Sequence, residues 1–101
     1  MIKLITLYPT PSDADHFRSY FVNKHLPLCR LIPGLNNAHY SLSPQVVEGL
    51  DRWFCLFEAE FIDRASLNAA LSTPQAHAAA SDIVNYSPKT PTSLIYTPQP
   101  V

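Results

Sequence analysis

Residues 53–61 read Trp-Phe-Cys-Leu-Phe-Glu-Ala-Glu-Phe, the most clearly patterned stretch of this 101-residue chain. The odd-numbered positions are all apolar, whereas the even-numbered positions become polar at Glu58 and Glu60. Successive side chains of a β-strand point to opposite faces, so the pattern predicts a strand with one buried face. The alternation assigns a face to each apolar residue: Trp53, Cys55, Phe57, Ala59 and Phe61 to the buried one, Phe54 and Leu56 to the other.

The segments before this strand alternate between strand and helix signals. Residues 2–8 are rich in β-formers and end before a proline. Ser12 and Asp13 offer an N-cap for a helix that runs to about residue 31. Pro27 interrupts this helix because it lacks the N–H that would bond the carbonyl four residues earlier. A second strand is predicted for residues 35–43.

The segments after it complete the pattern. Asp63 can cap a helix to about residue 71, and Thr73-Pro74 restarts helix with a cap followed by proline at the first position. Residues 92–97 predict a last strand. The order β-α-β-β-α-β, with the second helix in two pieces, is the ferredoxin-like α+β arrangement: a four-stranded antiparallel sheet with helices on one face. We expect one domain over residues 1–101.

Composition excludes several classes of function. The chain is 47% hydrophobic and 15% charged with a net charge of -1, and its Lys and Arg residues are scattered, so we exclude a nucleic-acid binder. Two glycines cannot build a Gly-rich phosphate loop, and two cysteines do not indicate a disulfide framework. Neither a leader pattern nor an apolar run near ~18 residues is present, so we expect a cytoplasmic protein without a membrane span.

The predicted sheet is apolar on both faces in places. Ile5 and Leu7 of the first strand, with Phe54 and Leu56 of the third, are assigned to the face away from the helices. Two helices cannot cover that face, and a second copy of the same sheet can, so we expect a homodimer. Burial by a ligand, or ordinary exposed apolar area, is the alternative.

Tyr20…His25-Leu26-Pro27-Leu28 is similar to the Y-x4-H-x-P-L signature of the EthD family. The family is named after a protein encoded with a cytochrome P450 system that degrades ethyl tert-butyl ether. The opening Ile2-Lys3-Leu4…Tyr8-Pro9 and the later Asp82-Ile83-Val84-Asn85-Tyr86-Ser87 resemble the family's first strand and its D-I-x-N-Y segment. The resemblance covers essentially the whole chain and implies the dimeric α+β barrel fold. His77 and Val84 depart from the family pattern.

His25 is the predicted catalytic residue. It lies at the margin of the apolar stripe of its helix, where an imidazole with a near-neutral pKa can exchange protons. The alternative is a structural histidine that bonds the carbonyl freed by Pro27. Tyr8, Tyr20, Asn85 and Tyr86 are the predicted substrate-binding residues, against the alternative that the tyrosines are core residues and Asn85 ends a helix. Glu58 and Glu60, about 7 Å apart on one strand face, are more simply solvated carboxylates.

The resemblance implies a protein that acts on or binds a small apolar organic compound in a barrel pocket between its subunits. Family members are often labelled as reductases, so we expect an oxidoreductase or an accessory to an oxygenase degradation pathway, with His25 in proton transfer. A non-catalytic binding or scavenging module is the alternative. The sequence identifies no cofactor, and the histidine spacings predict no metal site.

Overall fold

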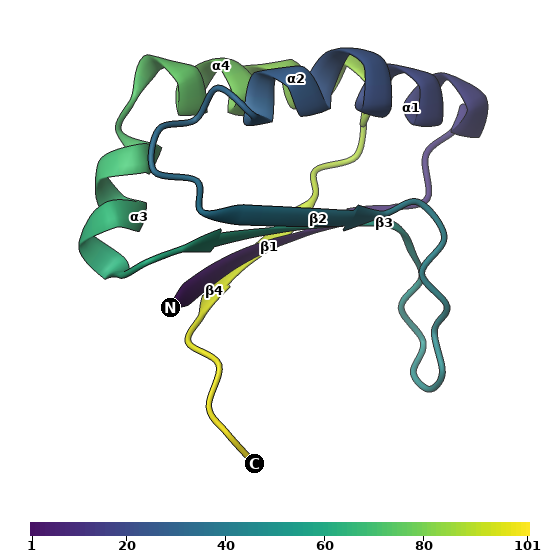
Figure 1. The fold of residues 1–101 in the computed structure, drawn as a ribbon. Helices are drawn as coiled ribbons and strands as arrows, with labels where there is room; N and C mark the ends of the chain where they lie inside the picture. Colours follow the sequence, from purple (N-terminus) through teal and green to yellow (C-terminus); the bar gives the residue numbers. More distant parts are fainter.

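The computed structural model describes all residues from 1 to 101 and has the expected ferredoxin-like topology (Figure 1). All strand pairs are antiparallel, in the order β2-β3-β1-β4. The elements along the chain are β1 (Ile2–Pro9), α1 (Ala14–Tyr20), η1 (Phe21–His25), α2 (Leu26–Cys29), β2 (Asn37–Ser41), β3 (Trp53–Phe61), α3 (Arg64–Leu71), α4 (Pro74–Asp82), η2 (Ile83–Asn85) and β4 (Thr92–Tyr96).

The helices form a layer on one side of the sheet, and the β2–β3 loop and the C-terminal tail extend on the other side (Figure 1). We call the side away from the helices the outward face. Each predicted helix start is confirmed, because the side chains of Asp13, Asp63 and Thr73 accept hydrogen bonds from the third N–H of α1, α3 and α4.

The interruption expected at Pro27 takes the form of a π-helical turn, η1, that precedes the proline. The Leu26 N–H bonds the Phe21 carbonyl, five residues earlier, so the turn is widened by one residue. Pro27 then falls near the start of α2, where a missing N–H costs little. The chain from Ala14 to Cys29 is therefore helical in three joined pieces, which places His25 at a π-to-α junction.

A bulge at the start of β3 corrects one sequence prediction. Tyr8 pairs with Cys55 but Pro9 pairs with Trp53, so Phe54 is an extra residue without a partner. The extra residue reverses the alternation for the two residues before Cys55, Trp53 and Phe54. The assignment of Trp53 to the buried face and of Phe54 to the outward face was therefore wrong.

Phe54 instead packs on the helix side. Its ring meets Phe17 of α1 edge-on at 5.0 Å between centroids, and the Arg18 guanidinium lies 5.0 Å from its centroid. Trp53 lies on the outward face with Leu7 and Leu56, beneath the β2–β3 loop.

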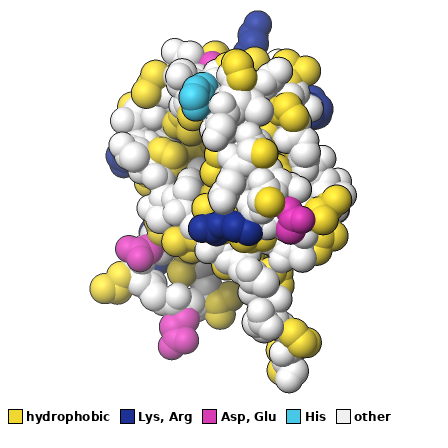
Figure 2. Space-filling view, turned by 90° about the vertical axis from the view of Figure 1, so that its left-hand side faces the viewer, with side chains coloured by type: hydrophobic (Ala, Val, Ile, Leu, Met, Phe, Trp, Pro, Cys, Tyr) yellow, Lys and Arg dark blue, Asp and Glu magenta, His cyan; other side chains and the backbone are white.

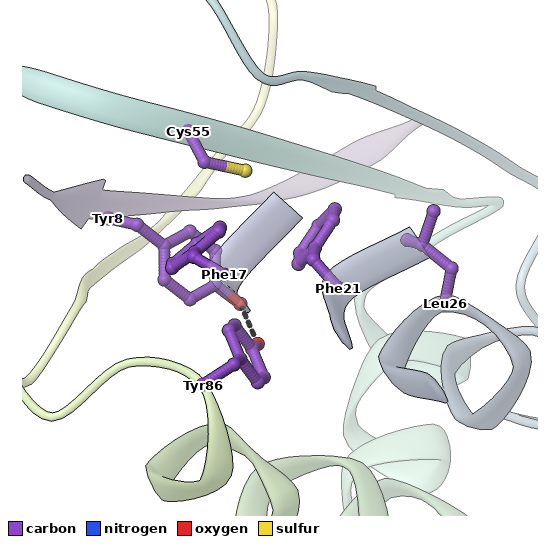
Figure 3. Close-up of a cluster of buried hydrophobic side chains, with 6 residues drawn as sticks. All are labelled: Tyr8, Phe17, Phe21, Leu26, Cys55 and Tyr86. Atoms are coloured by element: carbon purple, nitrogen blue, oxygen red, sulfur yellow. Dashed lines mark hydrogen bonds between the residues drawn. The ribbon is translucent and has the colours of Figure 1, made fainter. Parts of the chain in front are cut away.

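The core on the helix side consists of two clusters. One joins β1, β3, the first helix and the segment after η2: Tyr8, Phe17, Phe21, Leu26, Cys55 and Tyr86 (Figure 3). The other joins the opposite ends of the same strands to α3: Ile2, Ala59, Phe61, Leu67 and Ala70.

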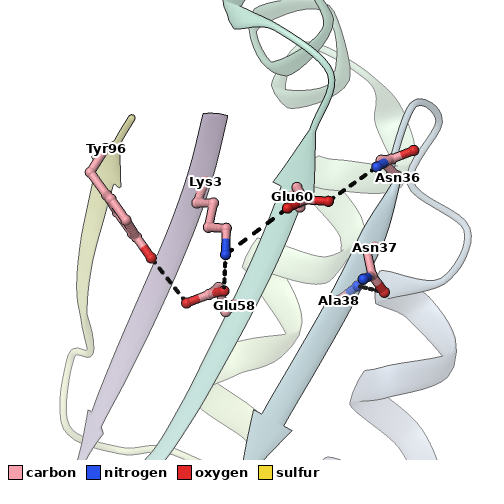
Figure 4. A network of polar contacts seen from close by, with 7 residues as sticks. All are labelled: Lys3, Asn36, Asn37, Ala38, Glu58, Glu60 and Tyr96. Atoms are coloured by element: carbon pink, nitrogen blue, oxygen red, sulfur yellow. Dashed lines mark hydrogen bonds and ion pairs between the residues drawn. The ribbon is translucent and has the colours of Figure 1, made fainter. Parts of the chain in front are cut away.

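The outward face is apolar at one end and charged at the other. Ile5 lies opposite Leu94, and Leu7 lies opposite Leu56, so these four side chains form an apolar strip across three strands. At the other end Lys3 Nζ lies 3.0 Å from a carboxylate oxygen of Glu58 (Figure 4). Lys3 also lies 4.0 Å from Glu60, and the Tyr96 hydroxyl donates to Glu58 over 3.1 Å.

The side of the molecule seen in Figure 2 carries isolated charged side chains among apolar and uncharged ones rather than a basic patch. No helix combines the length and the hydropathy that crossing a bilayer requires.

Candidate functional site

The candidate site is centred on the carboxylate of Asp82, the last residue of α4. Three side chains donate to it: the Tyr20 hydroxyl over 2.6 Å, His25 Nδ1 over 3.1 Å and the Asn85 amide over 3.0 Å. The donors come from α1, η1 and η2. One carboxylate at the end of α4 therefore links the helical segment of residues 14–29 to α4 and η2. Its side chain is 10% exposed, and that of His25 is 5% exposed.

The protonation states follow from these contacts. Burial raises the pKa of Asp82, but the hydrogen bonds from Tyr20, Asn85 and His25 outweigh it and hold the pKa below the ordinary value. Burial lowers the pKa of His25 below its usual value, although the neighbouring Asp82 opposes this. At neutral pH the pair is thus an ionised carboxylate beside an uncharged imidazole.

This pairing fixes the tautomer of His25. An ionised carboxylate only accepts hydrogen bonds, so Nδ1 must carry the proton and Nε2 must have a free lone pair. Nε2 has no hydrogen-bond partner in the protein. Every fully buried side-chain nitrogen or oxygen of the chain does have a partner, so Nε2 is not fully buried. Nε2 therefore keeps some contact with accessible space.

Aromatic rings surround the imidazole. Tyr86 lies 4.8 Å from His25 and stacks on Tyr20 at 5.6 Å, and Phe21 stacks on His25 at 5.6 Å, all between centroids. The Tyr86 hydroxyl bonds that of Tyr8 over 2.7 Å in the core (Figure 3). Burial raises the pKa of both tyrosines, so neither ionises near neutral pH.

An apolar cavity of about 120 Å³ adjoins this cluster between α2 and the β2–β3 edge. Its walls consist of eight residues: Leu26, Cys29, Arg30, Leu35, Ala38, His39, Tyr40 and Phe57. His25 does not line it, but Cys29 lies one helical turn further on, a spacing that puts Cβ atoms about 5–6 Å apart. The negative charge of Asp82 helps to raise the pKa of the Cys29 thiol, to about 11, behind the larger effect of burial.

Comparison with solved structures decides the family. The crystal structure of an ethyl tert-butyl ether degradation (EthD) family protein from Bacillus halodurans is 30% identical, with a TM-score of 0.88 over 98% of this chain and 99% of that chain. The chain belongs to the EthD family. No protein-family profile matches it.

The present chain is more distantly similar to an uncharacterised 11.0 kDa protein from the thcB-thcC intergenic region of Rhodococcus erythropolis. It is 23% identical over 86% of this chain and 84% of its own length. Two solved structures share the fold at lower identity. A dimeric ferredoxin-like protein of unknown function from Thermobifida fusca is 16% identical, with a TM-score of 0.72 over 94% of this chain and 88% of that chain. A point mutant of SnoaB, a cofactor-independent oxygenase from Streptomyces nogalater, is 15% identical, with a TM-score of 0.70 over 99% of this chain and 94% of that chain.

In the structure of the present chain, the five predicted site residues form one cluster. His25, Tyr20 and Asn85 meet at Asp82, and Tyr86 links them to Tyr8. The imidazole of His25 bonds Asp82, rather than the carbonyl freed by Pro27 that the structural alternative required. The cluster lies on the helix side of the sheet, so it is separated by the sheet from the outward face where the partner is expected.

Sequence reasoning missed the role of Asp82. The residue opens the D-I-x-N-Y segment, but nothing local connects it to His25, 57 residues earlier in the chain. His16 was also missed as a neighbour: its Nε2 lies 2.9 Å from the Asn85 carbonyl, and its ring lies 5.6 Å from that of Tyr20.

The other polar residues weighed as candidates lie elsewhere. Glu58 and Glu60 take part in the Lys3 network on the outward face (Figure 4). Nowhere do three or more His, Cys, Asp or Glu side chains converge in an arrangement that could hold a metal ion.

Proposed function

We propose that this protein binds a small apolar organic compound in the cavity between α2 and the β2–β3 edge. His25, one helical turn before Cys29 of the cavity wall, then exchanges a proton with the part of the compound that extends out of the cavity. The hydrogen bond from His25 Nδ1 to Asp82 carries the proposal, because it leaves Nε2 as a free base on a neutral, oriented imidazole. The apolar walls of the adjoining cavity support the kind of compound proposed.

The chemistry is proton abstraction. Nε2 takes a proton from an acidic O–H or C–H group of the compound, leaving an anion such as an enolate or phenolate. The imidazolium formed is stabilised by Asp82, whose position is held by Tyr20 and Asn85. The anion either recovers the proton at another atom or reacts with an oxidant such as O₂. The likeness in fold to a cofactor-independent oxygenase is consistent with the second course. The description of the EthD family, ethyl tert-butyl ether degradation, supports a role in degradation.

The working unit in this proposal is a homodimer that pairs the outward faces of two sheets. The strip of Ile5, Leu7, Leu56 and Leu94 supplies apolar area, and Leu94 is 51% exposed in the single chain. A neighbour of the same fold is described as dimeric. Each subunit then keeps its own His25 cluster on the helix side.

The test of function is solvent exchange catalysed by the protein. Butanone and acetophenone, incubated in D₂O with the protein, should exchange their α-hydrogens faster than in buffer, as followed by ¹H NMR. His25→Gln should lose at least tenfold of that acceleration while ligand-induced shifts of cavity amides persist. His77→Gln, which changes an exposed histidine on α4, should keep the full rate.

Two outcomes would contradict the proposal. Unchanged exchange by folded, dimeric His25→Gln would remove His25 as the base. Stoichiometric binding of the probes without any exchange would instead favour the non-catalytic binding or scavenging module.

A further inference from the structure

We propose that the preferred ligand of the cavity between α2 and the β2–β3 edge is a small monocarboxylate, with one ring or a short branched alkyl group as its apolar part. The inference rests on the proposed function in that it uses the same cavity. It adds the charge and size of the ligand, which neither the family nor the His25 cluster specifies.

The volume limits the apolar part. At about 120 Å³ the cavity is slightly smaller than an apolar protein cavity of about 150 Å³ that holds benzene. The inner walls are apolar, with Phe57 and Ala38 from the sheet side and Leu26 and Cys29 from α2. A single ring or a branched chain of a few carbons fits such a space.

The charge comes from the rim. Arg30 is the only Lys or Arg that lines the cavity, and no acidic side chain lines it. Arg30 is exposed, and its guanidinium makes no hydrogen bond or ion pair within the chain, in contrast to Arg18, which is paired with Asp15. A guanidinium without a partner at the mouth of an apolar cavity favours an anionic, planar group such as a carboxylate.

His39, the other basic residue of the cavity wall, is less suited to this role. It lies directly opposite Glu58 across the β2–β3 pair, and its proximity helps to lower the pKa of Glu58, after the larger effect of the hydrogen bond from Lys3. His39 therefore already has an acidic neighbour within the protein. We assign recognition of the carboxylate to Arg30, with the apolar end of the ligand directed inward toward Phe57.

The test compares benzoate with benzamide, a neutral compound of nearly the same shape. Both are titrated into the wild-type protein while amide shifts of Cys29 and Ala38 are followed by ¹H–¹⁵N NMR. Benzoate should bind about three- to tenfold more tightly than benzamide, and the preference should shrink when salt is raised. Arg30→Gln should abolish the preference by weakening benzoate alone. Arg64→Gln, the same change at an exposed position of α3, should leave the preference for benzoate intact. Ala38→Leu should weaken the binding of both compounds because the larger side chain fills the cavity.

The outcomes separate this inference from the proposed function. Equal binding of the two compounds, or a preference that survives Arg30→Gln, would overturn the carboxylate assignment and leave a cavity for neutral compounds. Binding of neither compound at millimolar concentration would overturn the assignment and also remove the cavity from the proposed function. Loss of benzoate binding in His25→Gln would show that the anion is bound at the imidazole and not at Arg30.

Discussion

The hydrogen bond between the hydroxyls of Tyr8 and Tyr86 allows a quantitative test of the core beside the site. The two residues are each 2% exposed, and the oxygens are 2.7 Å apart with no other protein partner. Tyr8→Phe and Tyr86→Phe each remove one hydroxyl and leave the other buried without a hydrogen bond. Such an orphaned group costs about 1–3 kcal/mol, so each single variant should lose about 2 kcal/mol of unfolding free energy. For a chain of this length that corresponds to a fall in midpoint temperature of about 8 °C or more.

The double variant should lose less than the sum of the two single variants, because removing both hydroxyls leaves no buried polar group unpaired. The expected coupling is about 1–2 kcal/mol. Urea unfolding followed by circular dichroism measures all four free energies at equal protein concentration, since the proposed dimer would make stability concentration-dependent. Additive single effects, with coupling below about 0.5 kcal/mol, would refute the reasoning that the two hydroxyls satisfy each other.

Three further predictions concern pH, assembly and a helix cap. The folded-state pKa of His25 lies below the unfolded value of 6.5, so the unfolded chain takes up a proton that the folded chain excludes. The unfolding free energy should therefore decrease as pH falls below 6.5. Urea titrations between pH 5 and 8 should show a smaller decrease for His25→Gln than for the wild-type protein. Leu94→Glu should convert the proposed dimer to monomer in analytical ultracentrifugation, whereas Val84→Glu on the helix side should not; a dimeric Leu94→Glu would exclude the outward face as the interface. Thr73→Ala should lower the unfolding free energy by about 1 kcal/mol in urea titrations because the Ala76 N–H loses its acceptor, and a change below about 0.3 kcal/mol would mean that this cap adds nothing.

The parts of the fold that the sequence predicts well depend on local signals. Asp63 and Thr73 mark the two later helix starts because a cap needs only a side-chain oxygen and an N–H three residues away. The alternation in residues 55–61 identifies the buried face of β3 for the same reason. Each signal lies within one turn or one strand of the feature that it specifies.

The features that the sequence does not reveal depend on pairing between distant segments. The bulge that reverses Trp53 and Phe54 is a property of how β3 is aligned with β1, and the alternation of β3 alone contains no trace of it. The contact between His25 and Asp82 likewise exists only because α2, which begins directly after His25, packs beside α4. The composition of the five-residue cluster could be anticipated, but the carboxylate at its centre, and its place on the helix side of the sheet, could not.

The central claim is that His25 is a neutral base whose proton resides on Nδ1, held there by Asp82. Two-bond ¹H–¹⁵N correlation spectra of the imidazole, recorded from pH 4 to 8, measure both the tautomer and the pKa. We expect a protonated Nδ1, an unprotonated Nε2 at pH 7 and a pKa below 6.5. A proton on Nε2 at pH 7, or a pKa above 6.5, would contradict it.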